Sequence, residues 1–526
     1  MGMQSLKKYC NEVLRAVENR SVKDIGQLSR LKNRLCKKYS IDFAPSNASI
    51  LCFAKRKSPR LLKVLEMKPV KSISGIVAVA LMPKPQKCPG KCIYCPNSLV
   101  EEETPKSYTG REPATLRALQ AKYNAKRQIQ GRIEQLEEMG HSAEKIELII
   151  MGGTFPAAKM EFQKKFMLDC LNAVNWKKSK SIAAAKKTAE KARHRIVGMT
   201  FETRPDYCGK AEIEAMLGFG ATRVELGVQS LDDSVLEKIG RRHGTGEVAK
   251  ATGLLKDSAL KVGYHLMPGL PYSSFSNDLK SFRKAFEDER FRPDMLKIYP
   301  CLVLKGTRLY RMWKKGEFEP LETEKAVDFI VKAKQFFPEW TRVMRIQRDI
   351  PTQLIEAGVK SSNIRQLVHE RLKEKGLKCN CIRCREIGLQ EYLHGKKPNA
   401  KNLSMKRQDY KASNGLECFL SMEDSGKNLY GFLRLRKPSD PFIKELEDSA
   451  LVRELHVYGT ALPIGERKSG KQQHSGIGKA LLQEAERVSR EEWGFGKQSI
   501  ISGIGVKEYY RKLGYRDDGF FESKLI

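Results

Sequence analysis

The sequence lacks any apolar run that approaches the roughly 20 residues a membrane-spanning helix requires. Its N-terminal segment, MGMQSLKKYCNEVLRAVENR, also lacks the apolar core of a signal peptide. There is no long-period repeat, and the only biased tract is the Lys/Ala-rich segment 177–193. These absences predict a protein that is neither exported nor anchored in a membrane, and we therefore expect it in the cytoplasm.

Acidic residues are scarce relative to basic ones. The chain has 62 Asp and Glu against 97 Lys and Arg, which gives a formal net charge of +35. This excess is larger than solubility alone requires, so it predicts a polyanionic partner. Nucleic acid is the first candidate, and an anionic membrane surface is the second.

The 13 cysteines are not spread as the disulfide framework of a secreted domain would be. Six of them fall into two tight clusters: Cys88, Cys92 and Cys95, and Cys379, Cys381 and Cys384. Tight clusters of this kind are typical of metal-binding thiolates in a reducing compartment.

A chain of 526 residues is long enough for two or three hydrophobic cores. Residues 1–70 mix basic and apolar residues at helical spacing, which predicts a basic, RNA-binding helical module, or alternatively a merely solvated helical face. In 71–345, six short apolar runs alternate with helix-length segments, which predicts a parallel partial or full (β/α) barrel. We expect a metal-stapled linker at 346–410 and a separate, strand-rich mixed α/β domain at 411–526.

The motif CPGKCIYCP places Cys88, Cys92 and Cys95 directly after the first apolar run. Three thiolates can hold three irons of a 4Fe-4S cluster and leave the fourth open to S-adenosylmethionine (SAM). A structural zinc ion would need a fourth protein ligand, and the nearest histidine, His141, is far along the chain. The motif therefore favours a cluster, and it resembles the signature of the radical SAM superfamily.

Further positions resemble the same superfamily. Gly152 and Gly153 end the second apolar run, where the superfamily places a glycine pair beside the methionine amino group of SAM. Thr154 stands where an acidic residue is frequent. Candidates for contacts with the SAM ribose and carboxylate, with buried strand-end salt bridges as the alternative, are Glu202, Arg204 and Gln229.

A second motif, QHSGIGK, contains Gln473, Gly476 and Gly478 at a predicted strand-to-helix turn. Glycines there let backbone amides reach a pyrophosphate, and the helix N-terminus adds positive potential. The order of strand, glycine turn, helix, strand and YYRKLGY, with Tyr509 and Tyr510, resembles the GNAT acyltransferase domain. In that domain the loop binds the CoA pyrophosphate and the tyrosines flank the thioester. A helix cap followed by an aromatic core is the alternative.

From about residue 70 to the C-terminus the chain resembles the catalytic subunits of Elongator, in their free-standing archaeal or bacterial form. The segments SYTGREP, ETRPDYC, HLMPGLP and YYRKLGY carry the resemblance. It implies a tRNA wobble-uridine carboxymethyltransferase with Cys88, Cys92 and Cys95 as cluster ligands. It also implies acetyl-CoA contacts at Lys145, Glu454, Leu455, His456, Val457, Ile477, Gly478, Lys479 and Tyr510.

The resemblance implies that reductive cleavage of SAM yields a radical that removes hydrogen from the methyl group of acetyl-CoA. The carbon radical then adds to C5 of the wobble uridine, and electron loss and thioester hydrolysis leave 5-carboxymethyluridine. We expect catalytic roles for Tyr509, Tyr510 and Lys297. Lys297 and Tyr299 would position substrate, unless they only pack at a strand end. We also expect the radical and acyl sites to share one cavity at the domain interface.

The second cysteine cluster, with His369 ten residues before it, predicts a structural zinc site without a catalytic role. Cys418 or His394 could replace His369 as the fourth ligand. The alternative is a set of unconnected surface thiols.

Basic residues in 1–70, 177–193 and 396–411 predict a track for tRNA phosphates, although each patch alone is more often a solvated face. The anticodon stem-loop offers the unstacked base that such chemistry requires. Two other functions stay open: a protein lysine acetyltransferase with a structural barrel, and a non-catalytic tRNA-binding scaffold. The sequence is compatible with accessory subunits or a homo-oligomer, and it does not identify an electron donor.

Overall fold

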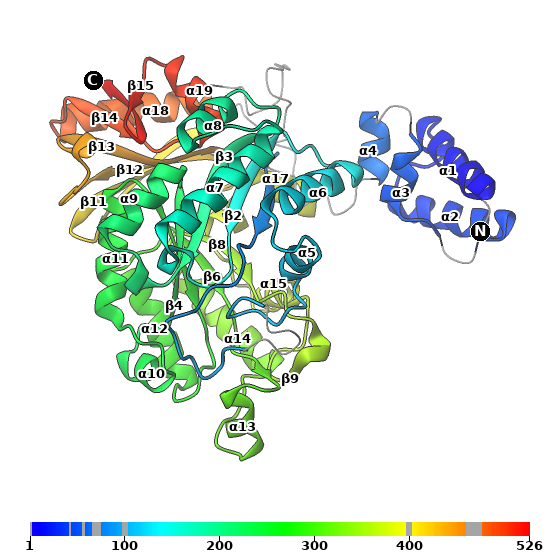
Figure 1. Cartoon of the computed structure of the whole chain (residues 1–526), viewed down its shortest axis with the longest axis horizontal. Helices are drawn as coiled ribbons and strands as arrows, with labels where there is room; N and C mark the ends of the chain where they lie inside the picture. Colours follow the sequence, from blue (N-terminus) through cyan, green and yellow to red (C-terminus); the bar gives the residue numbers. More distant parts are fainter. Residues whose placement is uncertain are drawn as a thin grey trace.

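The computed structural model describes residues 3–41, 44–54, 58–65, 75–96, 104–395, 402–458 and 476–526. Three parts follow one another along the chain: a helical N-terminal module, a parallel half-barrel and a C-terminal mixed sheet. Figure 1 shows the N-terminal helices on one side of the molecule and the C-terminal sheet on the other. No helix in these ranges is long and apolar enough to cross a membrane.

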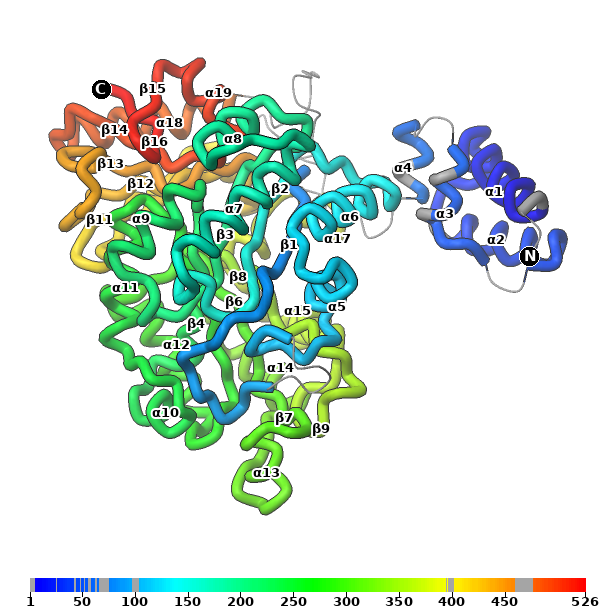
Figure 2. Tube along the Cα trace, viewed as in Figure 1, coloured from blue at the N-terminus to red at the C-terminus, as the bar shows by residue number. Residues whose placement is uncertain are grey.

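The N-terminal module has a hydrophobic core of its own. Tyr9, Val13 and Val17 on the first helix are fully buried and repeat at helical spacing. Asp24 caps the second helix by accepting a hydrogen bond from the backbone of Gln27. Figure 2 shows the module beyond α6, apart from the barrel. Its helices are α1 (Met3–Glu18), α2 (Ile25–Tyr39), α3 (Asn47–Cys52) and α4 (Pro59–Leu65).

The prediction of a parallel partial barrel is confirmed. Seven parallel strands pair in chain order, and the two outermost, β1 and β8, are not neighbours in the sheet. All six predicted apolar runs form strands, and the sequence interpretation missed only the seventh. The strands are β1 (Val77–Leu81), β2 (Lys145–Ile150), β3 (Arg195–Thr203), β4 (Arg223–Gln229), β5 (Lys261–Leu266), β6 (Met295–Ile298) and β8 (Arg342–Ile346).

Strand residues alternate between the two faces of the sheet. On β4, Val224, Leu226 and Val228 are fully buried and belong to the main hydrophobic core, whereas Glu225 and Gln229 line a cavity inside the half-barrel. The inner face at β4 therefore carries polar side chains, which suits a binding site better than a packed core. The helices around the barrel are α5 (Pro113–Gln120), α6 (Ala125–Glu138), α7 (Met160–Asn175), α8 (Ile182–Ala189), α9 (Lys210–Phe219), α10 (Asp233–Lys238), α11 (Thr245–Asp257), α12 (Phe275–Glu287), α13 (Arg308–Lys314) and α14 (Thr323–Ala333).

The segment that we expected to be a linker contains regular structure. A two-stranded antiparallel sheet joins β7 (Val303–Leu304) to β9 (Ile355–Ala357). Three helices follow: α15 (Ile364–Glu374), α16 (Ile382–Arg385) and α17 (Ile387–His394).

The C-terminal domain is a mixed seven-stranded sheet in the order β10-β11-β12-β13-β14-β16-β15. Among the described strands of this sheet, β13 and β14 alone pair in parallel, and their pairing covers Ser449 to Val452 on β13. The rest of β13 continues without a β14 partner, so the two strands diverge there. The elements are β10 (Ser404–Ala412), β11 (Gly415–Glu423), β12 (Leu429–Lys437), β13 (Ser449–Val457), α18 (Ile477–Arg487), β14 (Lys497–Ile500), α19 (Lys507–Arg511), β15 (Arg516–Asp518) and β16 (Phe521–Leu525).

This domain docks onto the N-terminal ends of the barrel strands. Arg453 of β13 donates to Asp294, which directly precedes β6, and to the carbonyl of Leu260, which directly precedes β5. Gly503 packs against the start of β3, where a Cβ atom would lie 2.2 Å from the carbonyl oxygen of Val197. The carboxyl ends of the strands therefore face away from the C-terminal domain.

Candidate active site and metal centres

A cavity of about 660 Å³ occupies the inside of the half-barrel, and residues at the carboxyl ends of the strands are part of its lining. It extends along β1, because Val77, Ala78 and Ala80 line it as well as residues at the strand ends. Nine of its lining residues were expected in the site: Cys88, Cys92, Cys95, Gly153, Glu202, Arg204, Gln229, Lys297 and Tyr299.

The loop with the first cysteine triad is held in place by the backbone around it. The amide of Ile93 donates to the carbonyl of Ile239 at 3.1 Å, and Cys95 Sγ accepts from the amide of Ser107 at 3.3 Å. Unlike the second triad, the three sulfurs do not all lie within 4.8 Å of one another. This wider spacing fits ligands of three different irons in a cluster better than three ligands of one ion.

Two buried polar atoms at this end of the cavity have no hydrogen-bond partner within the described ranges. Arg204 is held by Asp206 at 2.9 and 2.7 Å, but its Nη1 is buried and unpaired. Gln229 Oε1 is likewise buried without a partner. Gly153 has a φ of +91° and open space where a side chain would be. An orphan donor, an orphan acceptor and an exposed backbone fit a polar ligand such as SAM.

Lys297 lies between two carboxylates on the inner face. Its Nζ is 2.9 Å from Glu202 Oε1 and also contacts Glu225. Burial opposes its charge, but Glu202 and Glu225 outweigh burial and raise the pKa of Lys297. For Glu225, Lys297 and Arg223 outweigh burial and hold the pKa well below its usual range. Lys297 is therefore a fixed cation rather than a free base.

His265 was not predicted from the sequence, and it completes this group. Its Nε2 lies 2.8 Å from Glu225 Oε2, and its ring meets Tyr299 edge to face at 5.3 Å. Glu202, Glu225 and His265 present ligand atoms within 4.8 Å of one another, as a metal site does. The ammonium group of Lys297 already contacts both carboxylates, and Arg223 also pairs with Glu225, so the geometry favours substrate binding over a metal ion.

In the C-terminal domain, the predicted CoA-binding turn is described from Gly476 onward, and Gln473 lies outside the described residues. Gly476 caps α18 with a φ of +82°, and Ile477, Gly478 and Lys479 form the first turn. A Cβ atom at Gly478 would lie 2.9 Å from Tyr509 Oη and 3.6 Å from Val457. The structure thus brings the glycine turn, Tyr509 and the end of β13 together.

The two tyrosines differ in environment. Tyr509 is 41% exposed beside the start of α18, whereas Tyr510 is 5% exposed and packs against Tyr515. Burial raises the pKa of Tyr510. The position of Tyr509 suits contact with a ligand, and that of Tyr510 suits support of the fold.

The expected CoA contacts on β13 and β2 are less open. Glu454 accepts a hydrogen bond from Arg434 Nε at 2.8 Å through one oxygen of its carboxylate, so its side chain is already partly engaged. Burial lowers the pKa of His456 to about 4, and its ring stacks on Phe432. Leu455 and Val457 are half-buried on the same strand. Lys145 begins β2 at the barrel end that faces this domain, and burial lowers its pKa.

The structure differs from the expectation of one cavity shared by both domains. Every described residue that lines the barrel cavity lies between Val77 and Asp349, and none comes from the C-terminal domain. The physical reason is the docking of that domain at the N-terminal strand ends, opposite the cysteine loop. Polar contacts do continue through the barrel. Arg223 forms an ion pair with Glu225 at 3.2 Å and another with Glu147 at 2.5 Å.

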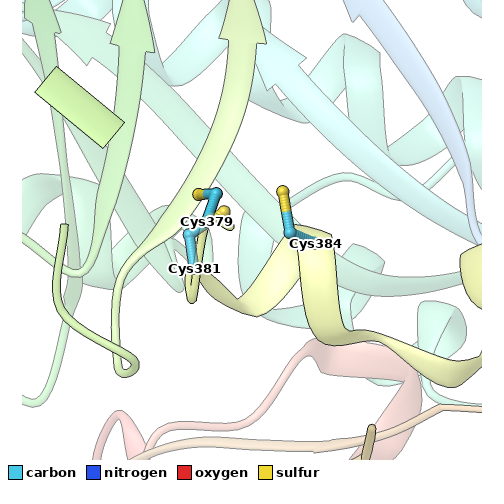
Figure 3. Close-up of side chains that lie close together, drawn as sticks. All are labelled: Cys379, Cys381 and Cys384. Carbon is cyan, nitrogen blue, oxygen red and sulfur yellow. The ribbon is translucent and has the colours of Figure 1, made fainter. Parts of the chain in front are cut away.

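The second cysteine triad forms a compact group. The sulfurs of Cys379, Cys381 and Cys384 lie within 4.8 Å of one another. Figure 3 shows Cys379 and Cys381 on the segment before the short helix that carries Cys384. Lys334 Nζ lies 3.1 Å from Cys379 Sγ and 3.7 Å from Cys384 Sγ. Hydrogen bonds from Cys379 and Cys384, aided by Lys334, hold the pKa of Cys381 well below its usual value.

None of the described candidates for a fourth ligand belongs to this group. His369 is exposed on α15, and Cys418 is buried on β11. Neither contributes an atom to the set within 4.8 Å.

The basic segments are spread over the molecule. Within 177–193, α8 covers only Ile182–Ala189. Residues 396–401 lie outside the described ranges, and the remainder of 396–411 enters the exposed strand β10.

Sequence reasoning missed Glu225, His265 and Arg241 in the cavity wall. The alternation along β4 and β5 could have indicated Glu225 and His265, since both occupy inward positions. Arg241 follows α10 in a loop and carries no periodic signal.

A parallel half-barrel with a Cys-x3-Cys-x2-Cys loop at its carboxyl end defines a radical SAM protein. The model of the Radical SAM superfamily matches residues 82–282, and that of the Radical_SAM C-terminal domain matches 293–374. The ELP3 N-terminal domain matches 6–73.

A tRNA uridine(34) acetyltransferase of Methanocaldococcus infernus is 49% identical over all of both chains. Elongator complex protein 3 of Drosophila melanogaster is 41% identical over 98% of this chain and 95% of the relative. The solved structure of the Methanocaldococcus infernus Elp3 with an N-terminal deletion has 47% identity and a TM-score of 0.77, and it covers 86% of this chain and 100% of its own. The chain belongs to the Elongator complex protein 3 family.

Proposed function

We propose that the protein modifies tRNA by installing a carboxymethyl group on C5 of the wobble uridine, with SAM and acetyl-CoA as co-substrates. The observation that carries the proposal is the cysteine loop above a polar barrel cavity, in a chain that also holds a glycine turn beside Tyr509. The names of the relatives, which specify uridine(34) of tRNA, support this substrate.

Cys88, Cys92 and Cys95 would hold the 4Fe-4S cluster. When bound, the cluster supplies the electron that cleaves SAM and so provides the radical that abstracts hydrogen. Arg204 Nη1 and Gln229 Oε1 would pair with polar groups of SAM, because both atoms are buried and otherwise unpaired. Gly153 leaves room for the ligand to approach the backbone.

Lys297 would orient the uracil ring. An ammonium group has three N–H donors, and the contacts with Glu202 and Glu225 use two of them. The third can donate to a uracil carbonyl oxygen in the cavity. Glu225 fixes His265 on the same wall, so the base would meet two preset polar groups.

The start of α18 would bind the pyrophosphate of acetyl-CoA. Backbone amides at a helix N-terminus attract anions, and the glycines at 476 and 478 keep them accessible. Tyr509 lies over this turn and would flank the acyl group. Tyr510 packs against Tyr509 and would hold that ring in place, and Lys145 would contribute a cation from the barrel.

The second triad would bind a structural zinc ion, because three sulfurs within 4.8 Å supply three of the four ligands of a tetrahedral site. The site would fix the segment between the barrel and the C-terminal domain. It is separate from the barrel cavity, whose lining includes none of the three cysteines.

The separation of the barrel cavity from the C-terminal domain favours one second candidate, a protein lysine acetyltransferase whose barrel is structural. That domain would then work alone with acetyl-CoA. Acetyl transfer by that domain would not require an iron-sulfur cluster.

One experiment separates these functions. Reconstituted protein is incubated anaerobically with unmodified tRNA, SAM, acetyl-CoA and dithionite, and nucleosides are analysed by mass spectrometry. Carboxymethyluridine is expected with the intact chain and with Cys170→Ala, a buried thiol outside both triads, but not with Cys92→Ala. Acetylated peptide without 5′-deoxyadenosine or altered uridine would contradict the proposal and support the acetyltransferase.

A further inference from the structure

Arg241 is a buried cation that reaches the cysteine loop. Its side chain is 7% exposed, and its Nη1 lies 3.6 Å from Cys92 Sγ. Two further contacts fix the guanidinium: Nη2 donates to the carbonyl of Gly227, and Nε donates to His243 Nε2 at 2.9 Å. The donor therefore has one orientation toward the sulfur.

The loop and the arginine are clamped together by close backbone contacts. A Cβ atom at Gly227 would lie 2.6 Å from Arg241 Nη2, so only glycine leaves room for the guanidinium. Gly240 has a φ of +74°, and a Cβ atom there would lie only 2.8 Å from the carbonyl oxygen of Lys91. The absence of a side chain at Gly240 therefore lets the cysteine loop pack closely. Cys92 thus cannot move far from Arg241 without breaking this packing.

No carboxylate of the described residues contacts Arg241 directly, and Asp206 acts on it only from a longer distance. Within the ranges that the structure describes, no carboxylate oxygen lies within 4.0 Å of its nitrogens. The neighbouring Arg204 differs, because Asp206 neutralises it. A buried charge normally has an opposite charge beside it, since desolvation is otherwise too costly. The thiol group that Arg241 contacts directly is that of Cys92, so a thiolate-bound cluster would supply its nearest counter-charge.

We propose that Arg241 sets the reduction potential of the cluster through its charged N–H contact with Cys92. The inference rests on the proposed function, in which the first triad binds a 4Fe-4S cluster. Reduction adds one negative charge to the cluster, and a fixed cation that donates to a ligand sulfur stabilises the reduced state more than the oxidised one. The guanidinium stays protonated at every working pH, so the effect is constant. Arg241 is a positioning residue that makes the first electron transfer easier.

The test is an EPR-monitored redox titration of the full-length reconstituted protein, together with its iron and sulfide content. Arg241→Gln removes the charge, and we expect its one-electron equilibrium to shift toward the oxidised cluster by about tenfold, which is about 59 mV. Arg241→Lys keeps a charge without the planar donor, and a smaller shift in the same direction is expected. The matched control is Arg242→Gln, an exposed neighbour that donates to the carbonyl of Pro89 at 3.3 Å and reaches no sulfur.

An Arg241→Gln protein with a full cluster and the same potential as Arg242→Gln would overturn the inference. If Arg241→Gln takes up no cluster, Arg241→Lys decides, and a potential equal to or above that of the control contradicts the proposal. A wild-type chain that itself binds no redox-active cluster would instead refute the proposed function.

Discussion

Arg453 of the C-terminal domain binds Asp294 of the barrel through hydrogen bonds of 2.6 and 2.8 Å, and neither side chain is exposed to solvent. Glu417 shares the same guanidinium at 2.7 Å. The relative position of the two domains is therefore set by buried charges that satisfy one another. Such pairs fix geometry more than they add stability, because desolvation offsets most of the attraction.

Breaking this pair is expected to weaken the whole chain. Arg453→Met removes the guanidinium that binds both Asp294 and Glu417 and leaves Lys256, at 3.6 and 3.4 Å, as their remaining shared cation. The free energy of unfolding should therefore fall by about 3 kcal/mol. Chemical denaturation measures the change. Arg490→Met removes an exposed ion pair with Glu491 and should leave the unfolding curve almost unchanged. A curve for Arg453→Met that overlays the control would show that the interface tolerates the loss.

His456 should make the chain sensitive to mild acid. Its folded-state pKa of about 4 lies below the ordinary histidine value of 6.5, so the unfolded chain binds a proton first as the pH falls. Stability is then lost from about pH 6.5 downward, by about 1.4 kcal/mol per pH unit until about pH 4. His456→Phe, which keeps an aromatic ring beside Phe432, should lose less stability than wild type between pH 6.5 and 5 in denaturant titrations. Equal losses in both proteins would contradict this role.

Gly478 should be essential for acetyl-CoA binding. A branched side chain there would collide with Tyr509 Oη, 2.9 Å from the Cβ position, and would cover the amides of the first turn of α18. Gly478→Val is expected to weaken acetyl-CoA binding at least about tenfold, or about 1.4 kcal/mol, in isothermal titration calorimetry. Gly496→Ala is the control, because no atom lies within 4 Å of its Cβ position. Unchanged affinity in Gly478→Val would place the CoA site elsewhere.

Cys381 should be required for a stoichiometric zinc ion. It is fully buried at the centre of the triad, so Cys381→Ser should remove one zinc per chain in elemental analysis and lower the melting temperature. Cys170→Ser, a buried thiol on α7, should keep the metal. Zinc that persists in Cys381→Ser would exclude this site.

The parts of the fold that alternate regularly could be predicted from the sequence. Six barrel strands carry apolar runs, whereas β8 was missed because Arg342 and Arg345 interrupt its pattern. The strand β10 reads as a basic loop, and its strand conformation depends on antiparallel pairing with β11. The conformation of such segments depends on pairing partners that are distant in sequence.

The candidate site divides in the same way. The cysteine triad is local in sequence, and its spacing alone indicated the cluster. Glu225, His265 and Lys297 meet only because β4, β5 and β6 are neighbours in the sheet. The docking of the C-terminal domain depends on single charged residues such as Arg453 and Asp294, which have no local motif. For this reason the expectation of one shared cavity could not be corrected from sequence.

The N-terminal module packs Tyr9, Val13 and Leu35 into a core that, among the residues the structure describes, shares no buried side chain with the main core. Unfolding the module therefore exposes none of the apolar surface inside the barrel. Heating the intact chain should produce two separate heat-absorption peaks, one for each core. A single melting temperature would then describe neither of the two unfolding transitions. The stability of each barrel variant must therefore be taken from the transition of the barrel.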